Sequence, residues 1–308
     1  MSNTNISSSF LATIEIVTIQ MTYYGPIILL TVGIFGCLCN FLTFTSRQLR
    51  ENSCAFYFLC SAIFEFLSIT FGLSTRLAAD HFDYDLQNSN RIFCKFRAYY
   101  VSSIPLIATY FILLSAIDRY MSSSTDVYLR SFSKIKVAYR NVIIFIIIGL
   151  ISCSHILILY DLRPKCATST GIYAIFDSIF VVLWLGVIPH VLMLTFGFLT
   201  LTNIRRTRQR RIVKLQMMLV QIGLSSILSL TRMIYYTYYI HGPLFTGDHK
   251  VIGSFLMSLT TLLYYTNYVK SFYIYTLTSQ LFRSIFIQRI HSCIQKRFES
   301  NTSIIMIV

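Results

Sequence analysis

Long apolar stretches alternate with short polar segments along nearly the whole chain. Seven stretches are long enough to cross the ~30 Å hydrocarbon layer of a bilayer as a helix. They cover residues 24–46, 55–74, 98–120, 141–160, 173–202, 213–239 and 251–278. The segments between them contain no internal repeat, low-complexity run or second domain. The pattern predicts an all-α membrane protein with one seven-transmembrane helix bundle over residues 24–278.

The first apolar stretch has a competing interpretation as a signal peptide. Residues 1–20 lack a basic segment, and residues 16–46 are uncharged and too long for the apolar part of such a peptide. We therefore expect a retained first helix, preceded by an extracellular arm over residues 1–23.

Composition and charge fit this topology. The chain of 308 residues is 55% hydrophobic and 12% charged, which excludes an ordinary soluble domain. The segments after the first, third and fifth stretches, together with the C-terminal tail, hold 17 Lys and Arg residues, against 7 on the opposite face. By the positive-inside rule these segments are cytoplasmic, which predicts a multi-pass plasma-membrane protein with its N-terminus outside. The net charge of +14 then faces anionic lipid, and nucleic-acid binding is not needed to explain it.

Two modification motifs fit the same orientation. Asn5 begins an Asn-Ile-Ser glycosylation sequon in the external arm. Residues 280–290 form an amphipathic segment typical of a helix lying in the membrane interface. This segment opens the cytoplasmic region over residues 279–308. Cys293, just beyond it, is a candidate for palmitoylation, and an unmodified thiol is the alternative.

One motif carries more information than any other in the chain. Asp118-Arg119-Tyr120 closes the third apolar stretch, and Cys94 lies before the start of that stretch, so the two are separated by one bilayer thickness. In this combination the chain resembles the rhodopsin-like G protein-coupled receptors. The resemblance implies a receptor that converts binding of an extracellular ligand into activation of a heterotrimeric G protein, with Asp118, Arg119 and Tyr120 at the coupling end. The resemblance implies a divergent member of that family.

The resemblance also implies a disulfide. Topology places Cys94 and Cys166 on the external, oxidising face, and the pair matches the family's bridge between the third helix and the loop after the fourth. Two free thiols are the alternative. The cysteines within the apolar stretches are expected to pack as small apolar residues.

Ionisable side chains within the apolar stretches are functional candidates, because an unpaired charge in hydrocarbon is costly. Glu65 and Asn40 match polar positions of the family's second and first helices, and Asn40 is expected to hydrogen-bond toward Glu65. In relatives this core binds sodium. Here Lys270, next to Ser271 in the seventh stretch, is a candidate counter-ion for Glu65, and extension of Lys270 toward the cytoplasmic interface is the alternative.

The seventh stretch departs from the family pattern. Tyr275 and Phe282 are in register with the family's Asn-Pro-x-x-Tyr motif and the Phe that follows it, but Ser271 and Phe272 replace the Asn and Pro. We therefore expect no proline kink there. The resemblance implies that Arg119 pairs with Asp118 at rest and swings toward Tyr275 in the active state, without the acidic partner that relatives carry on the sixth helix.

Two positions at which the chain differs from known ligand classes of the family restrict the kind of ligand it can bind. Val101 stands where amine receptors carry an Asp, and Tyr265 stands where opsins carry the Schiff-base Lys, which argues against a monoamine or retinal. The candidate pocket residues, from the third, fifth, sixth and seventh stretches, are Val101, Pro105, Asp177, Tyr235, Tyr239, Tyr264 and Tyr268. Interfacial aromatic belts are the alternative for the tyrosines. The external acidic residues Asp80, Asp83, Asp85, Asp161 and Asp177 would suit a basic or amidated peptide, such as a neuropeptide.

A secondary transporter and an intramembrane enzyme are the two alternative protein classes, and the sequence fits both less well. A secondary transporter would show repeated halves and interrupted helices with paired ionisable residues, and no such repeat is present. An intramembrane enzyme would need a catalytic or metal-binding constellation, whereas His155, His190 and Glu65 lie on different stretches without ligand spacing. We expect no enzyme activity, metal or cofactor.

Overall fold

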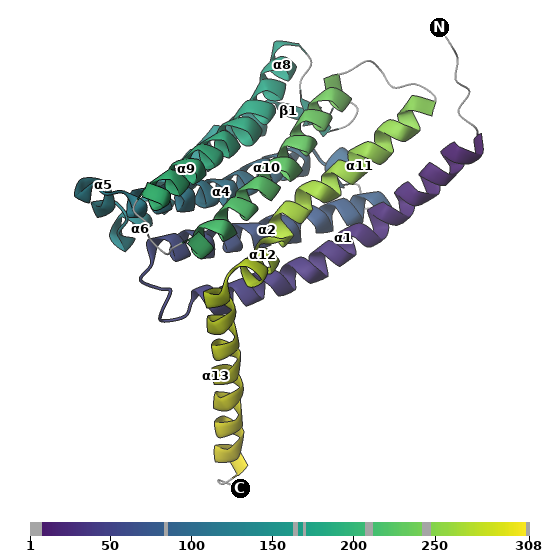
Figure 1. The fold of residues 1–308 in the computed structure, drawn as a ribbon. Helices are drawn as coiled ribbons and strands as arrows, with labels where there is room; N and C mark the ends of the chain where they lie inside the picture. Colours follow the sequence, from purple (N-terminus) through teal and green to yellow (C-terminus); the bar gives the residue numbers. More distant parts are fainter. Residues whose placement is uncertain are drawn as a thin grey trace.

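Helices account for most of the computed structural model, which describes residues 8–82, 86–162, 166–168, 171–206, 212–241 and 248–305. Their bounds in chain order are α1 Ser8–Phe44, α2 Ser53–His81, α3 Leu86–Ser89, α4 Arg91–Ser123, α5 Val127–Ser131, α6 Ile135–Ser152, α7 Ser154–Leu159, α8 Ile172–Ile179, the π-helix η1 Phe180–Val187, α9 Ile188–Arg206, α10 Ile212–His241, α11 Asp248–Val269, α12 Ser271–Thr278 and α13 Gln280–Ile305. The long helices lie side by side in one bundle, and α13 leaves it at a steep angle (Figure 1).

Five described stretches are long and apolar enough to cross a membrane. They are Ser9–Phe44, Ser53–His81, Arg91–Ser123, Ile135–Leu159 and Ile172–Arg205. On α6 the outward face exposes Ile143, Ile147 and Ile151, a stripe that water would solvate poorly and lipid would cover. The prediction of a helical protein with membrane-type helices is thus supported. The more polar helices α10 and α11 pack in the same bundle, α10 against α9 and α11, and α11 against α1.

The first helix is longer than the sequence predicted. Helix α1 starts at Ser8, so it includes residues 8–23 of the segment expected to form an extracellular arm. No Gly or Pro precedes Gly25, so nothing in this segment stops a helix from extending. At 37 residues α1 is about 55 Å long, well beyond the ~30 Å hydrocarbon layer. The glycosylation candidate Asn5 lies outside the described residues.

Helix α4 lies at the centre of the bundle, with α2, α6 and α9 packed around it. Its side chains Ile107, Ala108 and Phe111 are fully buried. Ile107 fits against α6 only because residue 149 is Gly, since a Cβ there would collide with the Ile107 side chain. The central helix therefore places Asp118 and Arg119 at one end of the bundle and Cys94 at the other.

The seventh predicted stretch is broken even though it lacks a proline. Helix α11 ends at Val269 and α12 starts at Ser271, with Lys270 between them at φ −67° and ψ −19°. The ammonium of Lys270 folds back to donate to the backbone oxygen of Asn267 at 2.9 Å. The interruption is not a proline kink, and it falls at a charged residue held by its own helix.

A small β-hairpin follows α7, which the all-α prediction omitted. Strands β1 Tyr160–Leu162 and β2 Cys166–Thr168 pair antiparallel, with Tyr160 opposite Thr168. The hairpin connects α7 to α8 at the end of the bundle. Because no helix continues there, the backbone groups of the two strands bond to each other.

The predicted disulfide is present. Cys94 at the start of α4 is bonded to Cys166 in β2, with the two Cα atoms 5.6 Å apart. The backbone N–H of Cys166 donates to Asn88 at 2.8 Å, and Asp161 in β1 makes an ion pair with Arg91 at 2.8 Å. These contacts fix the hairpin to the first turn of α4. We call this the disulfide end of the bundle and the opposite end the Arg119 end.

Replacing either bridged cysteine should destabilise the protein. We expect Cys94→Ala or Cys166→Ala to cost roughly 2–5 kcal/mol and to reduce surface expression. The double variant should be little worse than either single one, because both changes remove the same bond. Surface labelling and melting temperature measure this, with Cys293→Ala, an exposed free thiol, as the matched control. Additive losses would contradict the bridge.

Candidate functional site

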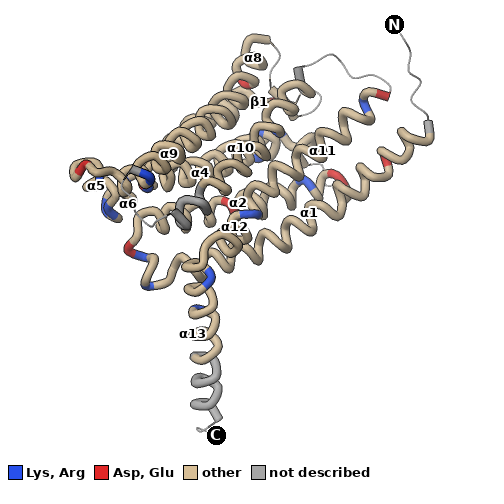
Figure 2. The backbone as a smooth tube through the Cα atoms, in the orientation of Figure 1, with Lys and Arg blue, Asp and Glu red and all other residues tan. Residues whose placement is uncertain are grey.

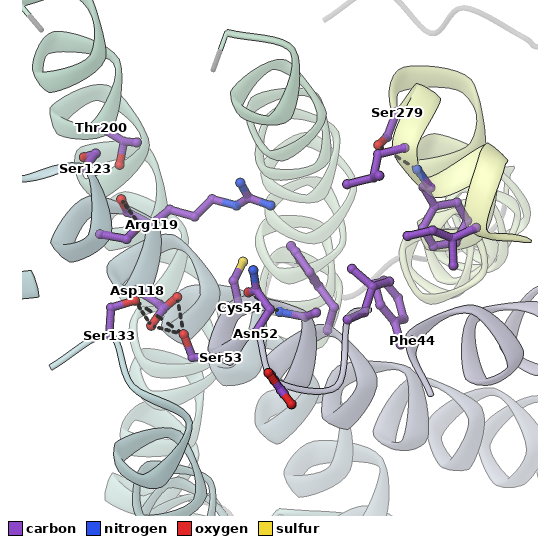
Figure 3. A pocket seen from close by; sticks show the side chains of 18 of the residues that line it. Phe44, Asn52, Ser53, Cys54, Asp118, Arg119, Ser123, Ser133, Thr200 and Ser279 are labelled. Carbon is purple, nitrogen blue, oxygen red and sulfur yellow. Dashed lines mark hydrogen bonds between the residues drawn. The ribbon is translucent and has the colours of Figure 1, made fainter. Parts of the chain in front are cut away.

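A cavity of about 510 Å³ lies at the Arg119 end of the bundle. Its walls come from the end of α1, the start of α2, the last turns of α4 and α9, and the start of α13. Figure 3 shows Arg119 reaching across this space from α4, with Ser279 on the far side. The cavity brings together segments that are far apart in the sequence.

The start of α2 is fixed by a side-chain cap. Asn52 adopts an extended backbone, and its side-chain oxygen accepts a hydrogen bond from the backbone N–H of Ala55 at 3.2 Å. Asn is one of the preferred residues at this position because it satisfies an otherwise unpaired helix donor. The cap places Ser53, the first residue of α2, against the end of α4.

Asp118 is held by two serines and not by Arg119. The hydroxyl of Ser53 donates to the carboxylate of Asp118 at 2.8 Å, and that of Ser133, from the loop before α6, donates at 2.9 Å. Asp118 is 4% exposed, so these bonds replace water that burial removes. The expected ion pair between Asp118 and Arg119, both of them described residues, is not formed. Neighbouring positions on a helix point about 100° apart, which turns the carboxylate toward α2 and the guanidinium toward the cavity.

The guanidinium of Arg119 makes no hydrogen bond within the described part of the chain, and its Nε atom is buried. A guanidinium carries five N–H donors in a planar fork that suits carbonyl and carboxylate oxygens. The Arg119 side chain is therefore available to an acceptor that enters the cavity. Its neighbour Tyr120 points elsewhere, with its ring 5.6 Å from the ring of Phe196 on α9.

Tyr275 lies beneath the cavity in an aromatic cluster. It is 1% exposed, and its ring lies 5.1 Å from that of Phe58 and 5.7 Å from those of Phe44 and Phe282. The predicted register of Tyr275 with Phe282 thus appears as a direct contact between α12 and α13. The cluster ties α12 and α13 to the ends of α1 and α2.

A polar network occupies the middle of the bundle. Glu65, 1% exposed on α2, accepts hydrogen bonds from Ser61 at 3.2 Å and from Ser271 on α12 at 2.9 Å. Ser271 in turn accepts a bond from the fully buried Gln221 of α10 at 3.2 Å. These contacts join three helices, and they satisfy polar groups that would otherwise be unpaired in an apolar interior.

Lys270 enters the same region without contacting Glu65. Its ammonium donates to Ser225 of α10 at 2.9 Å and bonds to the side chain of Asn267, which itself donates to Ser229 at 3.0 Å. The predicted direct ion pair between Lys270 and Glu65 is absent among the described salt bridges. The alternative, in which Lys270 extends toward the interface, is not seen either, because its ammonium bonds within the bundle. The reason is the rotation of about 100° between adjacent helix positions, which gives Ser271 the place facing Glu65.

Asn40, a residue of the predicted polar core, does not form the hydrogen bond predicted for it. It is 1% exposed, and its side-chain oxygen has no hydrogen-bond partner. The expected bond from Asn40 to Glu65 is not formed in the described structure. Glu65 is instead satisfied by the two serines.

The sequence interpretation missed the contribution of α10. Gln221, Ser225 and Ser229 lie four residues apart and so line one face of that helix, and each bonds to the α11–α12 segment. This spacing of polar residues within an apolar stretch was visible in the sequence. It indicates a buried polar face.

The predicted ligand-pocket residues do not form one site. Pro105, Tyr264 and Tyr268 line a cavity of about 10 Å³, room for about one water molecule. Tyr235 and Tyr239 instead bond to α11, through Gly253 and Ser254. Val101 is partly buried on α4 and does not line that cavity.

Asp177 belongs to the hairpin side of the disulfide end. It is 2% exposed on α8 and accepts a hydrogen bond from the Tyr160 hydroxyl at 3.1 Å. Cys293 on α13 is an exposed free thiol, as palmitoylation would require. In the described part of the chain, no three His, Cys, Asp or Glu side chains gather as metal ligands.

No protein-family model matches the chain, and a search of the curated proteins found no match. The functional assignment must therefore come from the residues and their geometry.

Removing the hydroxyl of Ser271 should loosen the central network. Ser271→Ala takes a donor from Glu65 and an acceptor from Gln221, both buried, and we expect a loss of roughly 1–3 kcal/mol. Thermal unfolding of the detergent-solubilised protein measures this. Ser284→Ala is the matched control, because that exposed serine bonds only to the backbone of its own helix. Equal melting temperatures for Ser271→Ala and the control would contradict the network.

Proposed function

We propose that the chain is a divergent rhodopsin-like G protein-coupled receptor. It binds an extracellular ligand at the disulfide end and activates a heterotrimeric G protein at the Arg119 end. The observation that supports this most is Arg119, which extends into an open cavity of about 510 Å³ at the end of the bundle opposite the disulfide.

The proposal requires seven membrane spans, with α10 as the sixth and α11 with α12 as the seventh. Helix α10 has 30 residues and α11 has 22, enough at 1.5 Å per residue to cross a ~30 Å layer. Their polar side chains lower their hydropathy, yet Gln221, Asn267 and Ser271 are buried. Polar groups that face inward are compatible with a spanning helix because partners within the bundle satisfy them.

Charge supports the proposed orientation. Figure 2 shows Lys and Arg around α5, at the start of α6 and at the start of α13, all toward the Arg119 end. By the positive-inside rule this end faces the cytoplasm. The disulfide end then faces the oxidising exterior, where a bridge between Cys94 and Cys166 persists.

Coupling would use the cavity directly. A G protein segment that enters it meets the guanidinium of Arg119, which can donate to backbone carbonyls at the end of a partner helix. Tyr275 lies near this space, on the short helix α12 beyond the break at Lys270. Rotation of α12 at that break would move Tyr275 out of its aromatic cluster and toward Arg119.

The resting state is held by few contacts. Asp118 is engaged by Ser53 and Ser133, so it does not restrain Arg119 through an ion pair. A population of coupling-competent molecules without ligand follows, because little free energy separates the two states.

We expect measurable nucleotide exchange without agonist, and we expect Arg119→Ala to reduce it to the level of cells lacking the receptor. Loss of the guanidinium removes the donors in the cavity but leaves the buried core intact. Exchange on a panel of G proteins, normalised to surface expression, measures this. Arg91→Ala, at the opposite end of α4, is the matched control and should keep the basal signal. Unchanged exchange in Arg119→Ala would overturn the proposal, and substrate uptake into proteoliposomes would favour a transporter.

A further inference from the structure

Arg232 lies within the half of the bundle nearest the disulfide end. It is nine residues before His241, the last residue of α10, and so about 14 Å below the end of that helix at 1.5 Å per residue. The side chain is partly buried between α10 and α11. A guanidinium at this depth has lost much of its hydration, and an arginine within a spanning helix calls for a functional explanation.

The contacts of Arg232 are weak for a buried cation. One N–H points to the sulfur of Met257 on α11 at 2.8 Å, and the guanidinium carbon lies 4.9 Å from the centre of the Tyr236 ring. A thioether is a poor acceptor, and a guanidinium has five N–H donors to satisfy. Within the described residues no carboxylate pairs with Arg232, since the ion pairs there are those of Arg76 and Arg91.

The surroundings add positive charge and hydroxyl groups. Tyr236, Tyr264, Tyr265 and Arg76 lie within electrostatic range of Arg232. Tyr264 also lines the small cavity of about 10 Å³, as does Met233, the residue after Arg232. A second guanidinium, that of Arg76, therefore adds to the positive potential around Arg232.

The acidic residues of the disulfide end are already engaged. Asp80 pairs with Arg76 at 3.3 Å, Asp161 pairs with Arg91, and Asp177 accepts from Tyr160. Asp80, Asp161 and Asp177 are therefore used within the chain, and Asp83 and Asp85 lie outside the described residues. The guanidinium of Arg232, which no described carboxylate pairs with, favours an anionic group on the ligand.

We propose that Arg232 anchors the anionic group of the ligand, beside the ring of Tyr236. This inference rests on the proposed function for the existence of an extracellular ligand. The anion would displace the Met257 sulfur and form charge-assisted hydrogen bonds with the guanidinium. The group is a carboxylate or a phosphate, and its two sources are the free C-terminus of a peptide and a small organic acid or phosphate.

The test uses the purified full-length protein and two readouts, melting temperature and nucleotide exchange on added G protein. The probes are acetate, succinate, inorganic phosphate, nucleoside monophosphates and a peptide library made in matched pairs with a free-acid or an amidated C-terminus. We expect stabilising and activating compounds only among the anionic members. The peptide pairs distinguish a C-terminal carboxylate from a small organic anion.

Variants of Arg232 make the test specific. Arg232→Gln keeps hydrogen-bonding groups but loses the charge, and we expect the potency of the active anion to fall roughly 10- to 100-fold. Arg232→Lys should recover part of that loss. Lys250→Gln, which removes an exposed charge at the start of α11, should leave the potency unchanged.

The outcomes separate the two proposals. Stabilisation by an anion that Arg232→Gln abolishes, without nucleotide exchange, supports the site and counts against the receptor function. Exchange driven by an amidated or cationic compound at equal potency in Arg232→Gln supports the receptor and overturns the site. A panel in which no anion stabilises or activates the unmutated protein also overturns the site.

Discussion

The low polarity of the bundle interior is the constraint on which this structure depends most. A polar group there is stabilised by a partner within the bundle, and the bond from Ser271 to Glu65 is the central example. That bond joins α12 to α2, and Gln221 extends it to α10. In a medium of low polarity such bonds are costly to break, so they fix which helix faces which. The break at Lys270 follows from the same constraint, since its ammonium is satisfied by Asn267 on its own helix and by Ser225.

The two ends of the bundle are built differently. At the disulfide end, a covalent bond, an ion pair and a β-hairpin hold the first turn of α4, and the space between the helices is small. At the Arg119 end the helices part around a cavity of about 510 Å³. A rigid end and an open end on one central helix suit a protein in which a signal at one end changes the packing at the other.

Both ends of the bundle combine partnered aspartates with an arginine that has no carboxylate partner among the described residues. Asp80 and Asp161 each make an ion pair with an arginine, and Asp118 accepts hydrogen bonds from two serines. Arg119 and Arg232 have no carboxylate partner in the described part of the chain. Each lies close to a tyrosine-containing aromatic cluster and to a space between helices. Unpartnered guanidinium groups near a cavity are consistent with binding of an external acceptor, since nothing in the folded chain uses their donors fully.

The sequence by itself determined the helical class and the positions of the long apolar segments, which follow from hydrophobic pattern and bilayer length, both local properties of the chain. The pairing of Cys94 with Cys166 was implied by the family resemblance, together with the side of the membrane on which each cysteine is expected. Only the tertiary structure decided the partners of Asp118, Glu65 and Lys270. A partner depends on helix rotation, and one position along a helix turns a side chain by about 100°. Lys270 and Ser271 are neighbours in the sequence, and the packing of α12 against α2 decides that Ser271, and not Lys270, contacts Glu65.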